Sequence, residues 1–201
     1  MDNIFMNNVI LVKERAGIFK AANAYDLFND KGQKIGEVLE RIPNFFVKAL
    51  KFTRYKTHLP YTVNFYDSSR NLLLTIRRPF TFFRSNISVK DKDGKPLGQY
   101  RQKFKLIKPE FHLFDPSGNL FASLKGDWKG WNFTLEDKSG AELAKVTKKW
   151  AGLAKEMFTS ADNYVISISK HDMPEDLRKV VFAAGIGIDM SLKEKRGVFG
   201  T

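Results

Sequence analysis

Lys and Arg residues gather in several short stretches, and they are the residue types in this chain best suited to hold a ligand. The ammonium and guanidinium groups bind phosphate or carboxylate, and an indole beside two cations is typical of an interface. The formal net charge of +12 at pH 7 favours anionic partners, and charge alone leaves both nucleic acid and anionic lipid headgroups open. The candidate anion-binding residues are Arg54, Lys56, Arg77, Arg78, Lys148, Lys149 and Trp150.

Residue types that catalyse reactions are present, but they do not form a recognisable catalytic set. His58, His112 and His171 are far apart in the sequence, without an acid or a second His at metal-ligand spacing. The chain has no Cys, which excludes thiolate nucleophiles, thiolate zinc sites and disulfides. No Gly-x-Ser-x-Gly, phosphate-loop or dinucleotide motif occurs. We therefore expect a binding protein rather than an enzyme, with no catalytic residue.

A repeated turn pattern predicts the elements that must position these residues. Alternating apolar residues end in Asp or Asn, two turn residues and, in four of five copies, Gly. The first side chain accepts hydrogen bonds from the following amides, and Gly tolerates the positive φ of the fourth position. In the copy without Gly, we expect Asn71 to adopt the positive φ more easily than Arg70. The copies begin at Asn29, Asp67, Asp91, Asp115 and Asp137.

Five hairpins imply at least ten strands, and their regular spacing favours a closed barrel or a sandwich. One helix departs from this β pattern: Asp172 is its predicted N-cap, Glu175 its third residue, and about Met190 its end. Residues 180–188 are apolar on every face, so the helix must be enclosed, and Gly185 and Gly187 suit close packing inside a barrel. This run is too short to span a bilayer, which needs roughly 20 residues.

We expect a single domain over residues 1–201, with a short N-terminal tail at 1–8 and a basic C-terminal tail at 193–201. The first eight residues carry no cationic stretch before an apolar one, so a signal peptide is not predicted. The expected protein is a monomer in the cytoplasm that associates peripherally with membranes.

Residues 149–164 resemble the signature of the phospholipid scramblase family, and residues 62–67 and 74–79 resemble a strand, turn and Arg-Pro element of the same family. The resemblance covers roughly residues 9–192. It implies the fold of the C-terminal domain of tubby proteins, a closed antiparallel barrel of twelve strands around a buried helix. It also implies binding of anionic phospholipid headgroups and movement of phospholipids between leaflets. The alternative for such a domain is a non-catalytic module that binds phosphoinositides, nucleic acid or protein.

The chain departs from the family in two places. After the Arg-Pro element, animal members carry a cysteine cluster, whereas this chain has three Phe residues. These are candidates for membrane contact, with a buried strand as the alternative, and they are Phe80, Phe82 and Phe83. The family's calcium segment makes Asp162, Asn163 and Asp172 candidate calcium ligands by resemblance. Ser160 stands where the family has an acid, so the alternative is a turn at residues 162–163 and a helix cap at Asp172.

Overall fold

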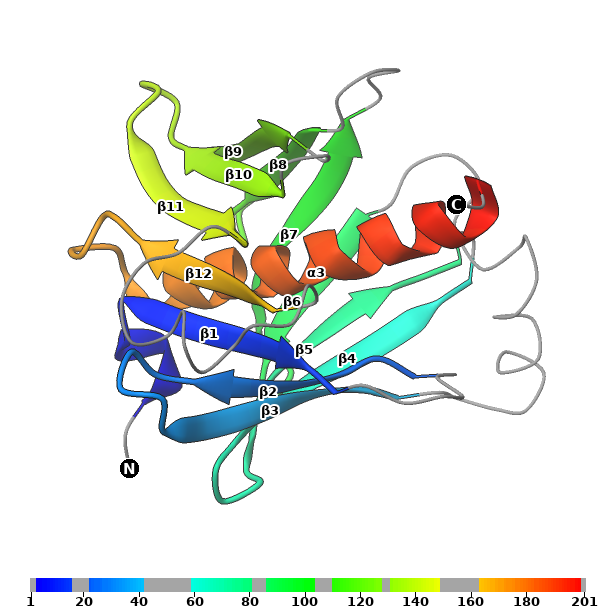
Figure 1. Ribbon diagram of the computed structural model, residues 1–201. Helices are drawn as coiled ribbons and strands as arrows, with labels where there is room; N and C mark the ends of the chain where they lie inside the picture. The colour runs from blue at the N-terminus through cyan, green and yellow to red at the C-terminus, as the bar shows by residue number, and fades with distance from the viewer. Residues whose placement is uncertain are drawn as a thin grey trace.

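The computed structural model describes residues 3–15, 22–41, 59–80, 86–103, 110–127, 131–148 and 163–199, without the side chains of 192–199. These residues form a closed antiparallel barrel around one helix (Figure 1). Each strand pairs with its neighbours in sequence, and β1 also pairs with β12 to close the barrel. The twelve strands are β1 (Val9–Glu14), β2 (Ala24–Phe28), β3 (Lys34–Arg41), β4 (Tyr61–Asp67), β5 (Leu72–Arg78), β6 (Asn86–Asp91), β7 (Pro96–Lys103), β8 (Glu110–Phe114), β9 (Leu120–Asp127), β10 (Asn132–Glu136), β11 (Glu142–Thr147) and β12 (Tyr164–Ile168). The predicted barrel is confirmed.

The five predicted turns are present and share one hydrogen-bond pattern. In each, the amide of the fourth residue donates to the carbonyl of the first over 3.0 or 3.1 Å. The first side chain caps later amides, as Asp67 does for Ser69 and Asn71, both at 2.8 Å. Four turns place Gly at φ between 75° and 88°. In the second turn Arg70 has φ 63°, so the expectation for Asn71 was wrong, because the hydrogen-bond pattern fixes the fourth position.

Helix α3 (Glu175–Phe199) passes through the barrel (Figure 1). Every residue from Val180 to Ser191 is buried, which confirms the enclosed helix. A Cβ on Gly187 would lie 2.1 Å from the Tyr100 hydroxyl oxygen, and one on Gly185 would lie 2.6 Å from Cδ1 of Ile166. A larger residue at position 187 would therefore clash with the Tyr100 ring, whereas one at position 185 would displace the end of the Ile166 side chain.

The helix differs from its predicted limits at both ends. It begins at Glu175, where the Arg178 amide donates to the Pro174 carbonyl over 3.0 Å, so Asp172 lies in the preceding turn and does not cap it. Its backbone continues to Phe199, so helix replaces most of the expected basic tail. The N-terminal turn lacks the capping side chain that the sequence suggested.

The first residues also differ from the expected tail. They include the 3-10 helix η1 (Ile4–Met6), in which Ile4 and Phe5 are buried. The buried guanidinium of Arg178 donates to the Phe5 carbonyl over 2.7 Å and to the Asn7 carbonyl over 3.0 Å. These contacts with α3 hold the N-terminal segment over one end of the barrel.

The barrel has two unlike ends. The five short turns lie at one end, together with residues 169–174, which lead from β12 into α3. We call this the turn end. Strands β1, β3, β5, β7, β9 and β11 finish at the opposite end, which we call the loop end. Helix α3 therefore runs from the turn end to the loop end (Figure 1).

Candidate anion-binding groove

An open groove with a volume of about 510 Å³ runs along the barrel over β4, β5 and β6. The alternation of buried and exposed residues on these strands shows which side chains face outward. Thr62 and Arg77 face each other across β4 and β5, and Thr75 faces Lys90 across β5 and β6. These four outward residues all line the groove, and two of them are cationic.

Arg77 and Lys90 are the available cations of this groove. Both are exposed, and neither forms an ion pair within the part of the chain that the structure describes. Lys92, a third cation of the groove, is paired with Asp93 over 2.9 Å. Arg77 lies opposite Ser88, two residues from Lys90, and such diagonal neighbours are about 7–8 Å apart. Two long side chains at this spacing can converge on one phosphate group.

The polar residues beside these cations are ordered by hydrogen bonds. Thr75 donates to the Asn64 side chain over 3.1 Å, and Asn64 donates in turn to the Tyr66 hydroxyl over 3.0 Å. Ser88 donates to the carbonyl of Arg77 over 3.3 Å. This network holds the outer surface of β4–β6 in one arrangement, so that the cations extend from a rigid support.

Arg78, the next predicted anion-binding residue, also borders the groove, but its side chain is buried and points into the barrel. It is 2% exposed, donates to the Leu59 carbonyl over 2.8 Å, and lies 4.3 Å from the centre of the Tyr61 ring. Leu74 and Ile76, its alternate neighbours on β5, are buried in the same way. We therefore assign Arg78 to the packing of the barrel wall.

Lys148 lies far from the groove around the barrel, at the loop end of β11. Its ammonium nitrogen is 4.6 Å from the centre of the buried Trp131 ring, which also packs against Tyr164 at 5.0 Å. Lys148 thus contributes to an aromatic cluster of β10–β12 and is half-buried. Arg54, Lys56, Lys149 and Trp150 fall outside the described residues, so their predicted role stays a prediction.

Phe80 lies two residues beyond β5, at the loop end, with 52% of its surface exposed. Its predicted contact with a membrane stays a prediction. Phe82 and Phe83 lie outside the described residues, and their role stays a prediction.

The two candidate calcium ligands that the structure describes lie at opposite ends of the barrel. Asn163 is buried at the loop end, before β12, whereas Asp172 is exposed at the turn end, after β12. The five residues of β12 separate them by about 17 Å, far beyond the reach of a shared cation. Asp162 lies outside the described residues, and the described residues hold no group of three acids or histidines arranged for a metal. Asn163 and Asp172 therefore cannot bind one calcium ion together, and the role of Asp162 stays a prediction.

Sequence reasoning missed Lys90 as a groove residue. Its position was nevertheless visible in the alternation of residues 86–91, where Ile87 and Val89 occupy the buried face and Lys90 the exposed one. What the sequence did not show was the pairing of β5 with β6, which places Lys90 near Arg77.

A closed twelve-stranded barrel around its own C-terminal helix defines a protein of the tubby-like class. An X-ray structure of a protein from Arabidopsis thaliana has a similar fold, with a TM-score of 0.50 and 15% sequence identity over 90% of this chain and 91% of that one. The sequence model of the Scramblase family matches residues 1–195, and the chain belongs to this family.

Three curated relatives illustrate the similarity. Altered inheritance rate of mitochondria protein 25 of Saccharomyces cerevisiae is 26% identical over 85% of this chain, and a phospholipid scramblase family protein of Schizosaccharomyces pombe is 25% identical over 91%. Human phospholipid scramblase 1 is 23% identical over 98%. The chain matches 64%, 52% and 64% of the length of these relatives.

None of the helices among the described residues is long and apolar enough to cross a bilayer.

Proposed function

We propose that this protein binds the anionic headgroups of phospholipids at a membrane surface through the groove over β4–β6, and thereby promotes transbilayer movement of phospholipids. Membership of the Scramblase family supports the lipid substrate, because two of the relatives above are named phospholipid scramblases or members of that family. The observation that carries the proposal is the pair of exposed cations, Arg77 and Lys90, on two of the three strands that line the groove.

A phosphodiester fits this pair of cations. It offers two unesterified oxygens that share one charge, so an oxygen can face each cation. Each Lys or Arg near an acidic membrane contributes about 1 kcal/mol, so the pair is expected to raise affinity about 30-fold.

The test is co-sedimentation with vesicles of phosphatidylcholine, with and without phosphatidylserine. The double variant Arg77→Ala/Lys90→Ala is expected to bind the anionic vesicles about 30-fold more weakly. Lys31→Ala/Lys138→Ala removes the same charge from two exposed turn residues and serves as the matched control. Equal binding by the groove variant and the native protein would exclude the groove as the headgroup site.

Nucleic acid is the competing anionic partner, and it gives a different result. A steep loss of binding with salt to single-stranded oligonucleotides, without binding to anionic vesicles even at low salt, would overturn the lipid proposal. Absence of both interactions would point to a protein partner.

Transbilayer movement is tested separately, with a fluorescent phospholipid in vesicles that contain the purified protein. The proposal expects a faster loss of lipid asymmetry than in vesicles without protein. An unchanged rate, with calcium and without it, would leave headgroup binding in place and remove the scrambling function.

A further inference from the structure

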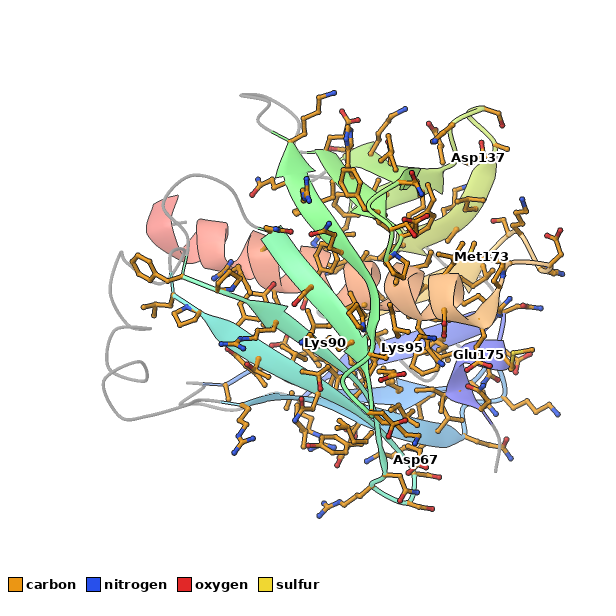
Figure 2. The ribbon with its side chains drawn as sticks, turned by 180° about the vertical axis from the view of Figure 1, so that it is seen from behind. Asp67, Lys90, Lys95, Asp137, Met173 and Glu175 are labelled. Carbon is orange, nitrogen blue, oxygen red and sulfur yellow. The ribbon has the colours of Figure 1, made fainter. Side chains whose placement is uncertain are left out.

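Charge is distributed unevenly along the barrel axis. The chain carries +12 overall, yet the segments of the turn end hold nine Asp and Glu residues against six Lys and Arg, a net charge of −3. These segments are 29–33, 67–71, 91–95, 115–119, 137–141 and 169–176. Figure 2 shows Asp67, Asp137 and Glu175 away from the C-terminal end of α3. The positive charge must therefore concentrate elsewhere on the molecule.

The turns themselves cause the acidity of this end. Each of them begins with Asp or Asn because this residue caps the following amides. Hydrogen bonds from Asn119 lower the pKa of Asp115, and those from Asn71 lower the pKa of Asp67, so both stay ionised. Two cations of this end are neutralised locally, since Lys92 pairs with Asp93 and Lys95 pairs with Asp176.

The loop end has the opposite character. Arg41 ends β3, Arg101 and Lys103 lie at the end of β7, and all three are exposed without an ion pair in the described ranges. In the sequence, the stretches that follow β1, β3, β5, β7, β9 and β11 contain 13 Lys or Arg residues against two Asp or Glu. These segments are 15–23, 42–60, 79–85, 104–109, 128–131 and 148–163. Exposed Phe80 lies at the same end.

We infer that the protein docks on an anionic lipid bilayer with its loop end, so that the barrel axis stands away from the membrane plane and the turn end points into solution. The inference rests on the proposed function and adds the orientation of the bound protein. The field of an acidic membrane decays over about 8–10 Å, which is less than the length of a strand of five to eight residues, about 17–26 Å. Attraction at the loop end is therefore not offset by repulsion at the turn end.

This orientation also serves the groove and the apolar contact. The groove reaches from Arg77, at the end of β5 nearest the loop end, to Lys92 and Gly94 of the turn end, so the Arg77 edge of the groove would meet the headgroups. Phe80 follows three residues later, where its exposed ring can enter the interface between headgroups and acyl chains.

The experiment compares two charge reversals that change the net charge equally and leave the groove intact. Arg41→Glu/Arg101→Glu alters the loop end, and Lys31→Glu/Lys138→Glu alters exposed residues of the turn end. On vesicles of phosphatidylcholine and phosphatidylserine, the loop-end variant is expected to lose at least about tenfold more affinity than the turn-end variant. Thermal unfolding of both variants checks that each is folded.

The outcomes separate the two proposals. If both variants lose the same affinity for the vesicles, or the turn-end variant loses more, the proposed orientation is wrong. The proposed function is still supported in that case, provided that the native protein binds the vesicles. Failure of the native protein to bind would remove both. If the loop-end variant does not fold, the orientation is tested with a fluorophore attached to a single introduced Cys. The label is specific to that position because the chain has no Cys of its own. A fluorophore on Phe80→Cys is expected to be quenched by bilayer-embedded quenchers and one on Ser117→Cys is not; the reverse, or equal quenching, would contradict the inference.

Discussion

Gly187 determines how closely α3 approaches β7. A Cβ at this position would meet the hydroxyl oxygen of Tyr100 at 2.1 Å and the ring carbon Cζ at 2.7 Å. Tyr100 is fully buried, and the aromatic ring of Phe111 packs against it at 6.2 Å, so the ring has little room to withdraw. Helix propensity alone would favour Ala here by about 1 kcal/mol.

We predict that Gly187→Ala destabilises the protein by about 1–3 kcal/mol, because overpacking outweighs the gain in helix propensity. Gly185→Ala is the matched control on the same helix. Its new Cβ meets the terminal Cδ1 of Ile166, which can rotate away, so the loss is expected to be smaller. Urea unfolding of both variants measures the difference, and equal or reversed losses would contradict this account of the packing.

Residue-level features were predictable from the sequence where a local hydrogen bond determines them. The four turns with Gly follow from the Asp or Asn three residues earlier, and the same pattern makes Arg70 adopt φ 63° against its preference. Arg78 shows why a cluster of basic residues in the sequence does not by itself predict a shared site. Arg77 and Arg78 are adjacent on a strand, so their side chains face opposite sides of the sheet. Alternation with Leu74 and Ile76 would have separated Arg78 from Arg77.

At the scale of elements, a charge network joins β1, β2 and β3 on the barrel surface. Arg15, directly after β1, donates to both carboxylate oxygens of Asp26 on β2, over 3.0 and 2.6 Å, and to Glu37 on β3. Lys34 adds an ion pair with Asp26 at 2.7 Å. The hydrogen bond from Arg15, followed by that from Lys34, lowers the pKa of Asp26 to about 2.

This pKa determines the sign of a pH effect. Because the folded value lies below the ordinary value of 3.8, ionised Asp26 stabilises the protein above pH 4, and this contribution is lost as the pH falls towards 2. We predict that Asp26→Asn lowers stability at pH 7 and flattens the decline between about pH 4 and 2. Urea unfolding between about pH 7 and pH 2 measures the free energy of unfolding of this variant. Asp30→Asn, in the turn after β2, removes the same charge and serves as the control. An unchanged slope in Asp26→Asn would contradict the prediction.

The ends of α3 could not be predicted, because contacts distant in sequence set them. The motif from Asp172 to Glu175 resembles a helix start, yet the chain turns at residues 171–172 before α3 begins. Arg178 then binds carbonyl groups of the N-terminal segment, more than 170 residues away. A pairing of this kind leaves no periodic pattern in the sequence.

At the scale of the whole molecule, the alternation of short turns and longer connections produces the polarity of the barrel. An antiparallel strand order with a hairpin at every second connection places all capping Asp residues at one end. At the other end, the described cations Arg41, Arg101 and Lys103 are exposed, and their like charges repel one another. The concentration of positive charge that favours binding to an anionic membrane therefore also lowers the stability of the unbound protein.

Because the same cations attract the membrane and repel one another, we predict that added salt stabilises the free protein and weakens its binding to anionic membranes. Raising NaCl from about 0.05 M to about 0.3 M shortens the screening length and weakens repulsion among the loop-end cations. Thermal unfolding, followed by circular dichroism, is expected to shift upward by about 2–4 °C, which corresponds to about 1 kcal/mol for a chain of this size. Over the same range, binding to anionic vesicles is expected to weaken, because attraction to the headgroups is screened as well.

The loop-end variant Arg41→Glu/Arg101→Glu is the control, since it removes part of the repulsion at its source. Its unfolding temperature is expected to rise less with salt than that of the native protein. A fall in the native unfolding temperature with salt would show that attractive pairs, such as Arg15 with Asp26, outweigh the repulsion at the loop end. Loss of vesicle binding could then no longer be attributed to screened attraction alone, because the folded protein itself would be losing stability.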